Sequence, residues 1–187
     1  MPVRGPSPDR SPSLLTLLQT LTREQILPGD PDAVFGFFAD AFNLEAITPP
    51  WLRFRVVTPG PIPMAPGTLI EYRLRLHGVP VRWLTRIEAW EPGARFTDVQ
   101  VRGPYGSWHH THSFEPHADG TLVRDAVRYE LPLGPLGRIA HSAFVRRDLE
   151  RIFDFRHEEV ARRLGAGTTT GASRPAAALR RGRPRPG

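Results

Sequence analysis

One short segment carries the densest group of side chains that can transfer protons or bind an ion. It reads Trp108-His109-His110-Thr111-His112-Ser113-Phe114. Successive side chains of a β-strand point to opposite faces of the sheet. As a strand, this segment therefore places His110 and His112 on one face together with Trp108 and Phe114. The aromatic neighbours indicate that this face lies in a core or lines a cavity.

The next strand-like segment offers partners for the two histidines. Its apolar-rich face consists of Val123, Asp125, Val127, Tyr129 and Leu131. Side chains that share a face contact one another across an antiparallel pair of strands. Asp125 and Tyr129 are therefore candidates to contact His110 and His112.

Asp98 and Gln100 alternate along the segment Phe96–Val101, and either of its faces could point inward. One phase buries Phe96 with Asp98 and Gln100, and the other buries Val99 and Val101. A buried Asp98 needs a partner, which a His or Arg side chain could supply.

Three kinds of chemistry fit these residues. A His–Asp cluster in a cavity can orient a ligand, or it can catalyse proton transfer, with His110, His112, Asp98 and Asp125 as the candidate catalytic residues. It can also bind a metal, with Asp98 or Asp125 as the third ligand. The simpler alternative is a set of structural histidines beneath a helix. Because His-x-His alone is a weak metal motif, we predict neither a metal nor a cofactor.

Composition excludes several other chemistries. The 187 residues contain no Cys, and all 25 basic residues are Arg, so thiol and Schiff-base catalysis are excluded. There is no G-x-G-x-x-G, no phosphate-binding loop and no G-x-S-x-G motif. No apolar run reaches the roughly 20 residues of a membrane-spanning helix, and no convincing export signal is present, so a cytoplasmic location is expected.

The net charge of +6 is concentrated near the ends of the chain. Residues 165–187 carry five Arg and no acid, whereas residues 21–164 carry 18 Arg and 18 acids. We therefore expect a solvated, disordered Arg-rich tail rather than specific nucleic-acid binding. Residues 1–15, rich in Pro and Ser, are expected to be disordered as well.

Local patterns between residues 16 and 164 predict one domain. A first strand over 16–27 precedes Asp30-Pro31, which suits a helix start with Asp at the N-cap. Asn43 could cap a second short helix that ends before Pro49-Pro50. Period-two patterns separated by Pro-Gly, His-Gly and Asp-Gly turns then predict six strands near 52–58, 68–76, 79–90, 94–102, 107–116 and 121–131. From Leu136 to Leu164 an apolar stripe of period 3.6 predicts a long helix, ended by Gly165.

These elements form an α+β fold: a curved, seven-stranded antiparallel sheet wrapped on one long C-terminal helix. A single helix cannot fill the concave face of such a sheet, so a ligand-sized gap is expected between them. Tyr72 and Trp83 lie in the inward phase of their strands and are expected to line it. Arg73 and Arg82 take the opposite phase and are expected to face solvent.

The sequence resembles the SRPBCC domains, the START and Bet v 1-like helix-grip superfamily, over residues 16–164. The resemblance is carried by several strings: Phe37-Phe38-Ala39-Asp40 with Asn43-Leu44, Thr48-Pro49-Pro50-Trp51-Leu52, Gly78-Val79-Pro80-Val81-Arg82-Trp83, Phe96-Thr97-Asp98-Val99-Gln100, Gly103-Pro104-Tyr105, Tyr129-Glu130-Leu131-Pro132-Leu133-Gly134 and Ile152-Phe153-Asp154-Phe155-Arg156. They are similar to a bacterial, cyclase/dehydrase-like branch of that superfamily. The resemblance implies a helix-grip fold with a hydrophobic cavity, and it favours the phase that buries Phe96 with Asp98.

The sequence thus predicts a domain that binds a small hydrophobic molecule of lipid, isoprenoid or polyketide type. The predicted ligand-binding residues are Tyr72, Trp83, Asp98, Gln100, Trp108, His110, His112 and Tyr129. One alternative is a cyclase/dehydratase-like enzyme that uses a His–Asp pair in the same cavity. Another is a non-catalytic module that presents the long helix or the Arg-rich tail to a partner. The oligomeric state is left open.

Overall fold

The fold was analysed in a computed structural model that describes residues 18–131 and 135–166. The predicted disordered segment 1–15 and the tail beyond residue 166 lie outside the described residues. Seven strands form one antiparallel sheet in the order β1-β7-β6-β5-β4-β3-β2. The elements follow one another as β1 Gln19–Leu27, α1 Pro31–Ala39, α2 Asn43–Ala46, the 3-10 turn η1 Pro50–Leu52, β2 Arg55–Val56, β3 Leu69–Leu76, β4 Val79–Glu91, β5 Arg95–Arg102, β6 Ser107–His117, β7 Gly120–Glu130 and α3 Pro135–Ala166. The predicted α+β helix-grip fold is confirmed.

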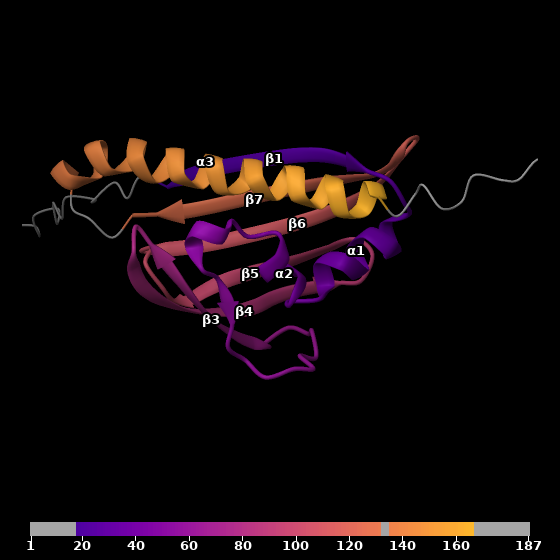
Figure 1. The fold of residues 1–187 in the computed structure, drawn as a ribbon, viewed down its shortest axis with the longest axis horizontal. Helices are drawn as coiled ribbons and strands as arrows, with labels where there is room; N and C mark the ends of the chain where they lie inside the picture. Colours follow the sequence, from indigo (N-terminus) through magenta and orange to yellow (C-terminus); the bar gives the residue numbers. More distant parts are fainter. Residues whose placement is uncertain (1–17, 132–134, 167–187) are drawn as a thin grey trace, which may run out of the picture.

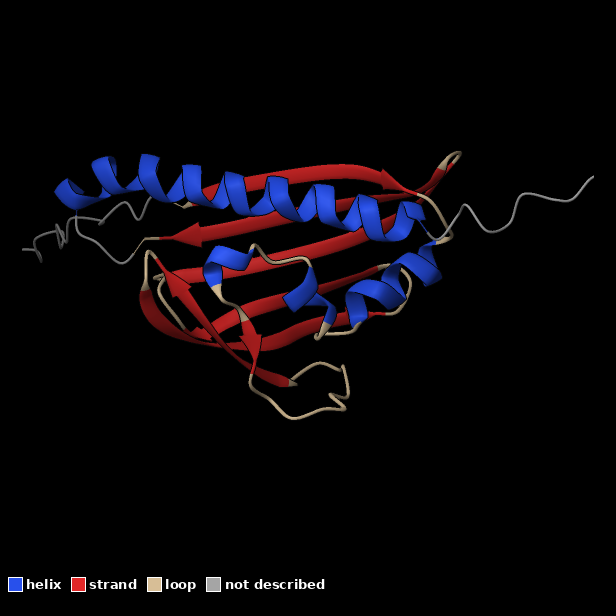
Figure 2. Ribbon diagram, viewed as in Figure 1, coloured by secondary structure: helices blue, strands red, loops and turns tan. Residues whose placement is uncertain are grey.

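Two separate sets of helices cover the inner face of the sheet. Helix α3 runs along β1 and β7, whereas α2 lies over the middle strands and α1 lies at one end of them, at the right of the view (Figure 1). The sheet bends around both sets (Figure 2). Shifts in the β4–β5 register at Leu84/Thr85 and at Ile87/Ala89 mark irregularities of the kind that curve a strand.

The chain between β1 and β2 begins as expected and then departs from the prediction. Asp30 is the N-cap of α1, and its carboxylate accepts a hydrogen bond from the Ala33 amide at 2.8 Å. Asn43 does not cap α2, because Phe42 occupies that position, and the Asn43 side chain instead donates to the Phe37 carbonyl at 2.8 Å.

Only two residues of the strand expected over 52–58 form a strand, since η1 ends at Leu52 and residues 53–54 and 57–58 are irregular. Pro50 starts η1, Leu52 is buried, and Arg53 adopts a left-handed conformation with φ 44°. The turn ends at Arg53, and pairing with β3 begins only at Arg55, so β2 spans only Arg55–Val56. Likewise, α3 continues through Gly165 to Ala166, two residues past the predicted end.

The remaining strands agree with the predicted periodicity. Along β6, buried and half-buried residues alternate from Ser107 to Phe114. In α3, Leu149, Phe153 and Val160 are buried at helical spacing against the sheet. The tight turn between β6 and β7 depends on Gly120, whose φ is +135°. A Cβ at this position would point at the carbonyl oxygen of Leu27. None of the helices within the described residues is both long enough and apolar enough to span a membrane.

Candidate functional site

A buried cluster of two histidines and two aspartates lies at the centre of the sheet. The register places His110 of β6 opposite Asp98 of β5, and His112 of β6 opposite Asp125 of β7. His110 and His112 are only 4% and 5% exposed. His110 and His112 therefore share the inner face, as strand alternation predicted. Phe96 and Asp98 point inward with them, which is the phase of that strand that the family resemblance favoured.

The distances show how the cluster is connected. His110 lies between both carboxylates, with Nδ1 3.4 Å from Asp98 Oδ2 and Nε2 3.6 Å from Asp125 Oδ1. His112 Nδ1 lies 2.5 Å from the same Asp125 oxygen. The two imidazole rings are 4.0 Å apart, centroid to centroid, and His112 stacks on Phe96 at 4.3 Å. One oxygen of Asp125, Oδ1, therefore lies near a ring nitrogen of each histidine.

The pKa values of the two histidines are shifted in opposite directions because their surroundings differ. Burial lowers the pKa of a histidine, but the carboxylates of Asp125 and Asp98 outweigh burial at His110 and raise its pKa. His112 is buried as deeply and lies beside His110, so its pKa is lowered. Burial would raise the pKa of Asp125, yet the facing histidines hold it well below its usual range. The cluster thus pairs an ionised Asp125 with a His110 that is protonated more readily than His112.

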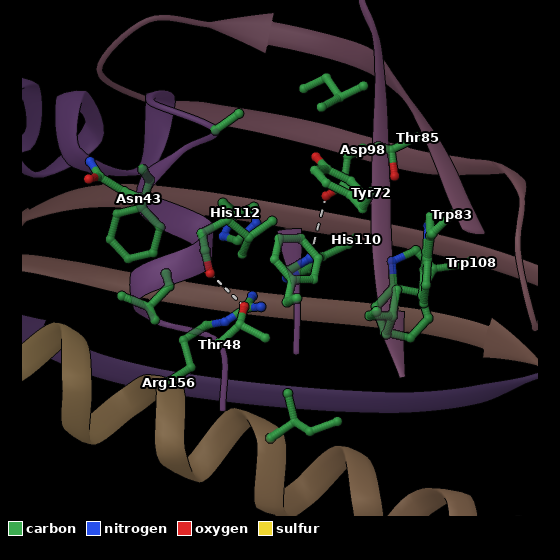
Figure 3. Close-up of a pocket in the computed structure, with 18 of the residues that line it drawn as sticks. Asn43, Thr48, Tyr72, Trp83, Thr85, Asp98, Trp108, His110, His112 and Arg156 are labelled. Atoms are coloured by element: carbon green, nitrogen blue, oxygen red, sulfur yellow. Dashed lines mark hydrogen bonds and ion pairs between the residues drawn. The ribbon is translucent and has the colours of Figure 1, made fainter. Parts of the chain in front are cut away.

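A cavity of about 150 Å³ opens between this cluster and the helices. Its walls are mainly apolar and come from β3, β4, α1, α2 and α3, among them Phe38, Leu44, Ile70, Ile87 and Phe153. The expected residues Tyr72, Trp83, Asp98, Trp108, His110 and His112 all line it. In Figure 3 these side chains surround one space between the sheet and α3, which runs along the bottom of the view.

Two expected ligand-binding residues lie outside this lining. Gln100 is engaged with a loop, since its side-chain amide donates to the Tyr105 carbonyl at 2.8 Å. Tyr129 pairs with Trp108 rather than with a histidine, because the β6–β7 register sets it opposite that residue. The ring of Tyr129 lies 5.7 Å, centroid to centroid, from the ring of Tyr105, which itself lines the cavity. Tyr129 therefore packs against a lining residue and does not line the cavity.

Arg156 is a cavity residue that the sequence analysis did not single out. It reaches from α3 toward Thr48 and the two histidines (Figure 3), and its guanidinium carbon lies 5.0 Å from the Phe153 ring. Its Nε is buried without a hydrogen-bond partner. Burial lowers the pKa of Arg156, although Asp125 and Asp98 act in the opposite direction. A signal was present in the sequence: Arg156 stands three and four residues from Phe153, Ile152 and Val160, on the apolar stripe of the helix.

The donor set Asp98, His110 and His112 could bind a divalent cation. Their ligand atoms lie within 4.8 Å of one another. Ligands about 2.1 Å from a tetrahedral ion lie only about 3.4 Å apart. Metal binding would therefore require these side chains to draw together and His110 to turn away from a carboxylate, so the ion-paired arrangement is the better account of the cluster.

A second, larger hollow of about 580 Å³ adjoins the first. The two share Leu52, Leu76, Tyr105, Leu149 and Ile152 in their linings. At the rim, His77 of the β3–β4 turn lies 2.5 Å from Asp148 of α3, Nε2 to Oδ2. Only a few side chains therefore separate the inner cavity from the outer hollow, and the two together reach the size range of small-molecule sites.

A curved antiparallel sheet, a long C-terminal helix and an apolar cavity between them define a helix-grip domain of the hydrophobic-ligand-binding class. The sequence comparison agrees: residues 19–165 match the family described as polyketide cyclase / dehydrase and lipid transport, and the chain belongs to that family. No curated protein matches the sequence.

Solved structures share the fold at low sequence identity. A Thermus thermophilus protein is 22% identical, with a TM-score of 0.62 over 81% of this chain and 100% of its own. Ara h 8.0201 is 15% identical, with a TM-score of 0.60 over 80% and 99%. The di-domain ARO/CYC StfQ of the steffimycin biosynthetic pathway is 10% identical, with a TM-score of 0.62 over 80% of this chain and 51% of its own.

Proposed function

We propose that the protein binds a small, largely apolar molecule of lipid, isoprenoid or polyketide type in the cavity between the sheet and α3. The observation that carries this proposal is the composition of the cavity, where apolar walls surround a few polar groups. Burying about 200 Å² of ligand surface at about 25 cal/mol/Å² stabilises a complex by on the order of 5 kcal/mol before entropic costs.

The test measures binding of 2-ethylnaphthalene by quenching of tryptophan fluorescence, since Trp83 and Trp108 line the cavity. We expect saturable one-to-one binding. Ala41→Trp, which places a large side chain in the cavity lining, should abolish it. Ala33→Trp is the matched control, because Ala33 lies on the exposed face of α1. Equal binding by both variants, or no saturable binding by the wild-type protein, would contradict the proposal.

Native mass spectrometry of the purified protein complements this test. A copurified apolar molecule should appear as a discrete mass increment on the folded protein. The increment should be absent from Ala41→Trp and present on Ala33→Trp. The same spectrum would show a bound metal ion, and that result would support the alternative use of Asp98, His110 and His112.

One observation favours a second candidate function, a cyclase/dehydratase-like enzyme. His110 faces the cavity, is held by Asp98 and Asp125, and has a raised pKa. A histidine tuned in this way can donate a proton near neutral pH. Such an enzyme should accelerate deuterium exchange at the α-carbons of 2-tetralone, an apolar bicyclic ketone, as measured by NMR in D₂O.

The matched variants use two histidines of the same strand. His110→Gln should remove the acceleration, whereas His109→Gln should leave it intact, because His109 lies on the outer face and pairs with Glu88 at 3.0 Å. Exchange no faster than in buffer would leave ligand binding as the function and dismiss the catalytic candidate.

A further inference from the structure

The inner cavity contains a guanidinium group, that of Arg156, for which the described residues supply no hydrogen-bond acceptor. Arg156 lines the cavity, and within the part of the chain that the structure describes its side chain makes no hydrogen bond. Its closest defined contact is the face of Phe153, 5.0 Å away. An Arg carries five N–H donors in a fixed planar fork. Nε is buried, and leaving a buried donor unpaired is costly, so an acceptor on another molecule would complete the arrangement.

The nearby carboxylates do not complete it. Asp98 and Asp125 attract Arg156 electrostatically, but their oxygens face the histidines. Three other arginines of α3 form ion pairs with glutamates, Arg146 with Glu150 at 3.0 Å and both Arg162 and Arg163 with Glu159. Arg156 instead extends into the space in front of His110 and His112 (Figure 3). Its free donors are therefore directed at whatever occupies the cavity.

The complementary ligand group follows from the geometry of the fork. Guanidinium donors bind carbonyl and carboxylate oxygens with two parallel hydrogen bonds or with one shared acceptor. The cavity already holds the carboxyl groups of Asp98 and Asp125 beside His110 and Arg156. A ketone brings an acceptor oxygen without a further charge, whereas a carboxylate brings one together with a negative charge.

We propose that Arg156 binds the carbonyl-type oxygen, of a ketone or a carboxylate, at one end of an otherwise apolar ligand, and thereby selects oxygenated ligands over hydrocarbons. This inference rests on the proposed binding function. The apolar part of the ligand contacts the walls around Ile87 and Phe153, and the outer hollow accommodates a longer body.

The experiment compares three probes of nearly equal shape: 2-acetylnaphthalene, 2-naphthoate and 2-ethylnaphthalene. Their dissociation constants are measured by tryptophan quenching with the wild-type protein, Arg156→Met and Arg147→Met. Arg147 is the matched control because it lies on the exposed face of α3. We expect the wild-type protein and Arg147→Met to bind at least one oxygenated probe about tenfold more tightly than 2-ethylnaphthalene. Whether the ketone, the carboxylate or both gain identifies the source of the oxygen.

In Arg156→Met the preference should fall below about twofold, while affinity for 2-ethylnaphthalene stays within about threefold of wild type. Arg156→Gln, which retains polarity without the fork, should give the same loss and serves if the Met variant fails to fold. A preference that survives both substitutions, or none in the wild type, overturns the inference and points to water as the partner of Arg156. Absence of binding by all three probes would instead overturn the proposed function.

Discussion

His110 and His112 show how two identical side chains on one strand acquire different properties. Both are buried, but His110 faces two carboxylates and His112 mainly one, beside a charged neighbour. The pKa of His110 is raised and that of His112 is lowered. A group with a raised folded-state pKa stabilises the fold below about pH 6.5 and loses this effect at higher pH, whereas His112 acts in the opposite sense. Their contributions therefore oppose each other around neutral pH.

Asp125 makes the clearer contribution to stability as pH changes. Its pKa is lower in the folded state, so its stabilisation is present above about pH 4 and is lost as the pH falls further. We expect the free energy of unfolding of the wild-type protein, from urea titrations, to fall between pH 5 and pH 3. Asp125→Asn should be less stable by roughly 3 kcal/mol at pH 6 and should lose less on acidification. Asp119→Asn, at an exposed turn, should behave like wild type; a wild-type curve flat over this interval would contradict the assignment.

For individual residues, the sequence predicted the face of the sheet on which a side chain lies better than it predicted which other side chain it contacts. Strand alternation was sufficient to place His110 and His112 on one face, whereas it left both faces open for Asp98, whose inward orientation was favoured only by the family resemblance. It could not distinguish Tyr129 from Asp125 as the partner of a histidine, because that depends on the register between two strands. Arg156 was missed because a charged side chain on an apolar helix stripe is usually assumed to bend toward solvent.

Among the elements, the β6–β7 hairpin has the strictest local requirement. A Cβ at Gly120 would lie 2.1 Å from the Leu27 carbonyl oxygen, and φ there is +135°. Since the neighbour is backbone, neither group can move aside cheaply. This contact ties the hairpin to the end of β1, the strand that pairs with β7 along its whole length.

We therefore expect Gly120→Ala to destabilise the fold by roughly 3 kcal/mol, from backbone strain and overpacking combined. Gly67→Ala is the matched control, because Gly67 also has positive φ, +92°, but open space around its Cα. Its cost should be limited to strain, about 1 kcal/mol. Thermal unfolding followed by circular dichroism measures both. Equal losses would show that the close approach to Leu27 is relieved by a small shift of the chain.

Long periodic elements were the most predictable part of the fold. The stripe of α3 and the strands β3 to β7 follow directly from periods of 3.6 and two. The segment from Asn43 to Val56 was predicted less well, since its course depends on burying Leu52 and on a left-handed Arg53. Neither effect is encoded in local propensity, so the turn η1 and the short β2 were not predicted.

At the level of the whole molecule, the main feature is the pair of adjoining hollows between the sheet and its helices. The inner one is about 150 Å³ and the outer about 580 Å³. No sequence pattern gives such volumes, because they are what remains after all side chains have packed. The sequence could only predict that one helix is too small to fill the concave face.

The wall shared by both hollows offers a test of their connection. Ile152 lines both, so Ile152→Trp should obstruct passage between them. We expect association of 2-ethylnaphthalene with the inner cavity to slow at least tenfold in stopped-flow fluorescence. Arg151→Trp, one position along the helix and exposed, lines only the outer hollow and should slow it far less. Unchanged association in Ile152→Trp would mean that ligands reach the inner cavity by another path.

The separation of α3 from the group α1, α2 and η1 affects how a ligand of the proposed kind would enter and leave the cavity. Helix α3 and the group α1, α2 and η1 come from opposite ends of the described chain and lie over different parts of the sheet (Figure 1). The His77–Asp148 contact joins α3 to the distant β3–β4 turn at the rim. Displacing one cover by a few ångströms breaks side-chain contacts of this kind but no ladder of the sheet. For the ligand binding proposed above, opening the cavity would therefore not require the sheet to unfold.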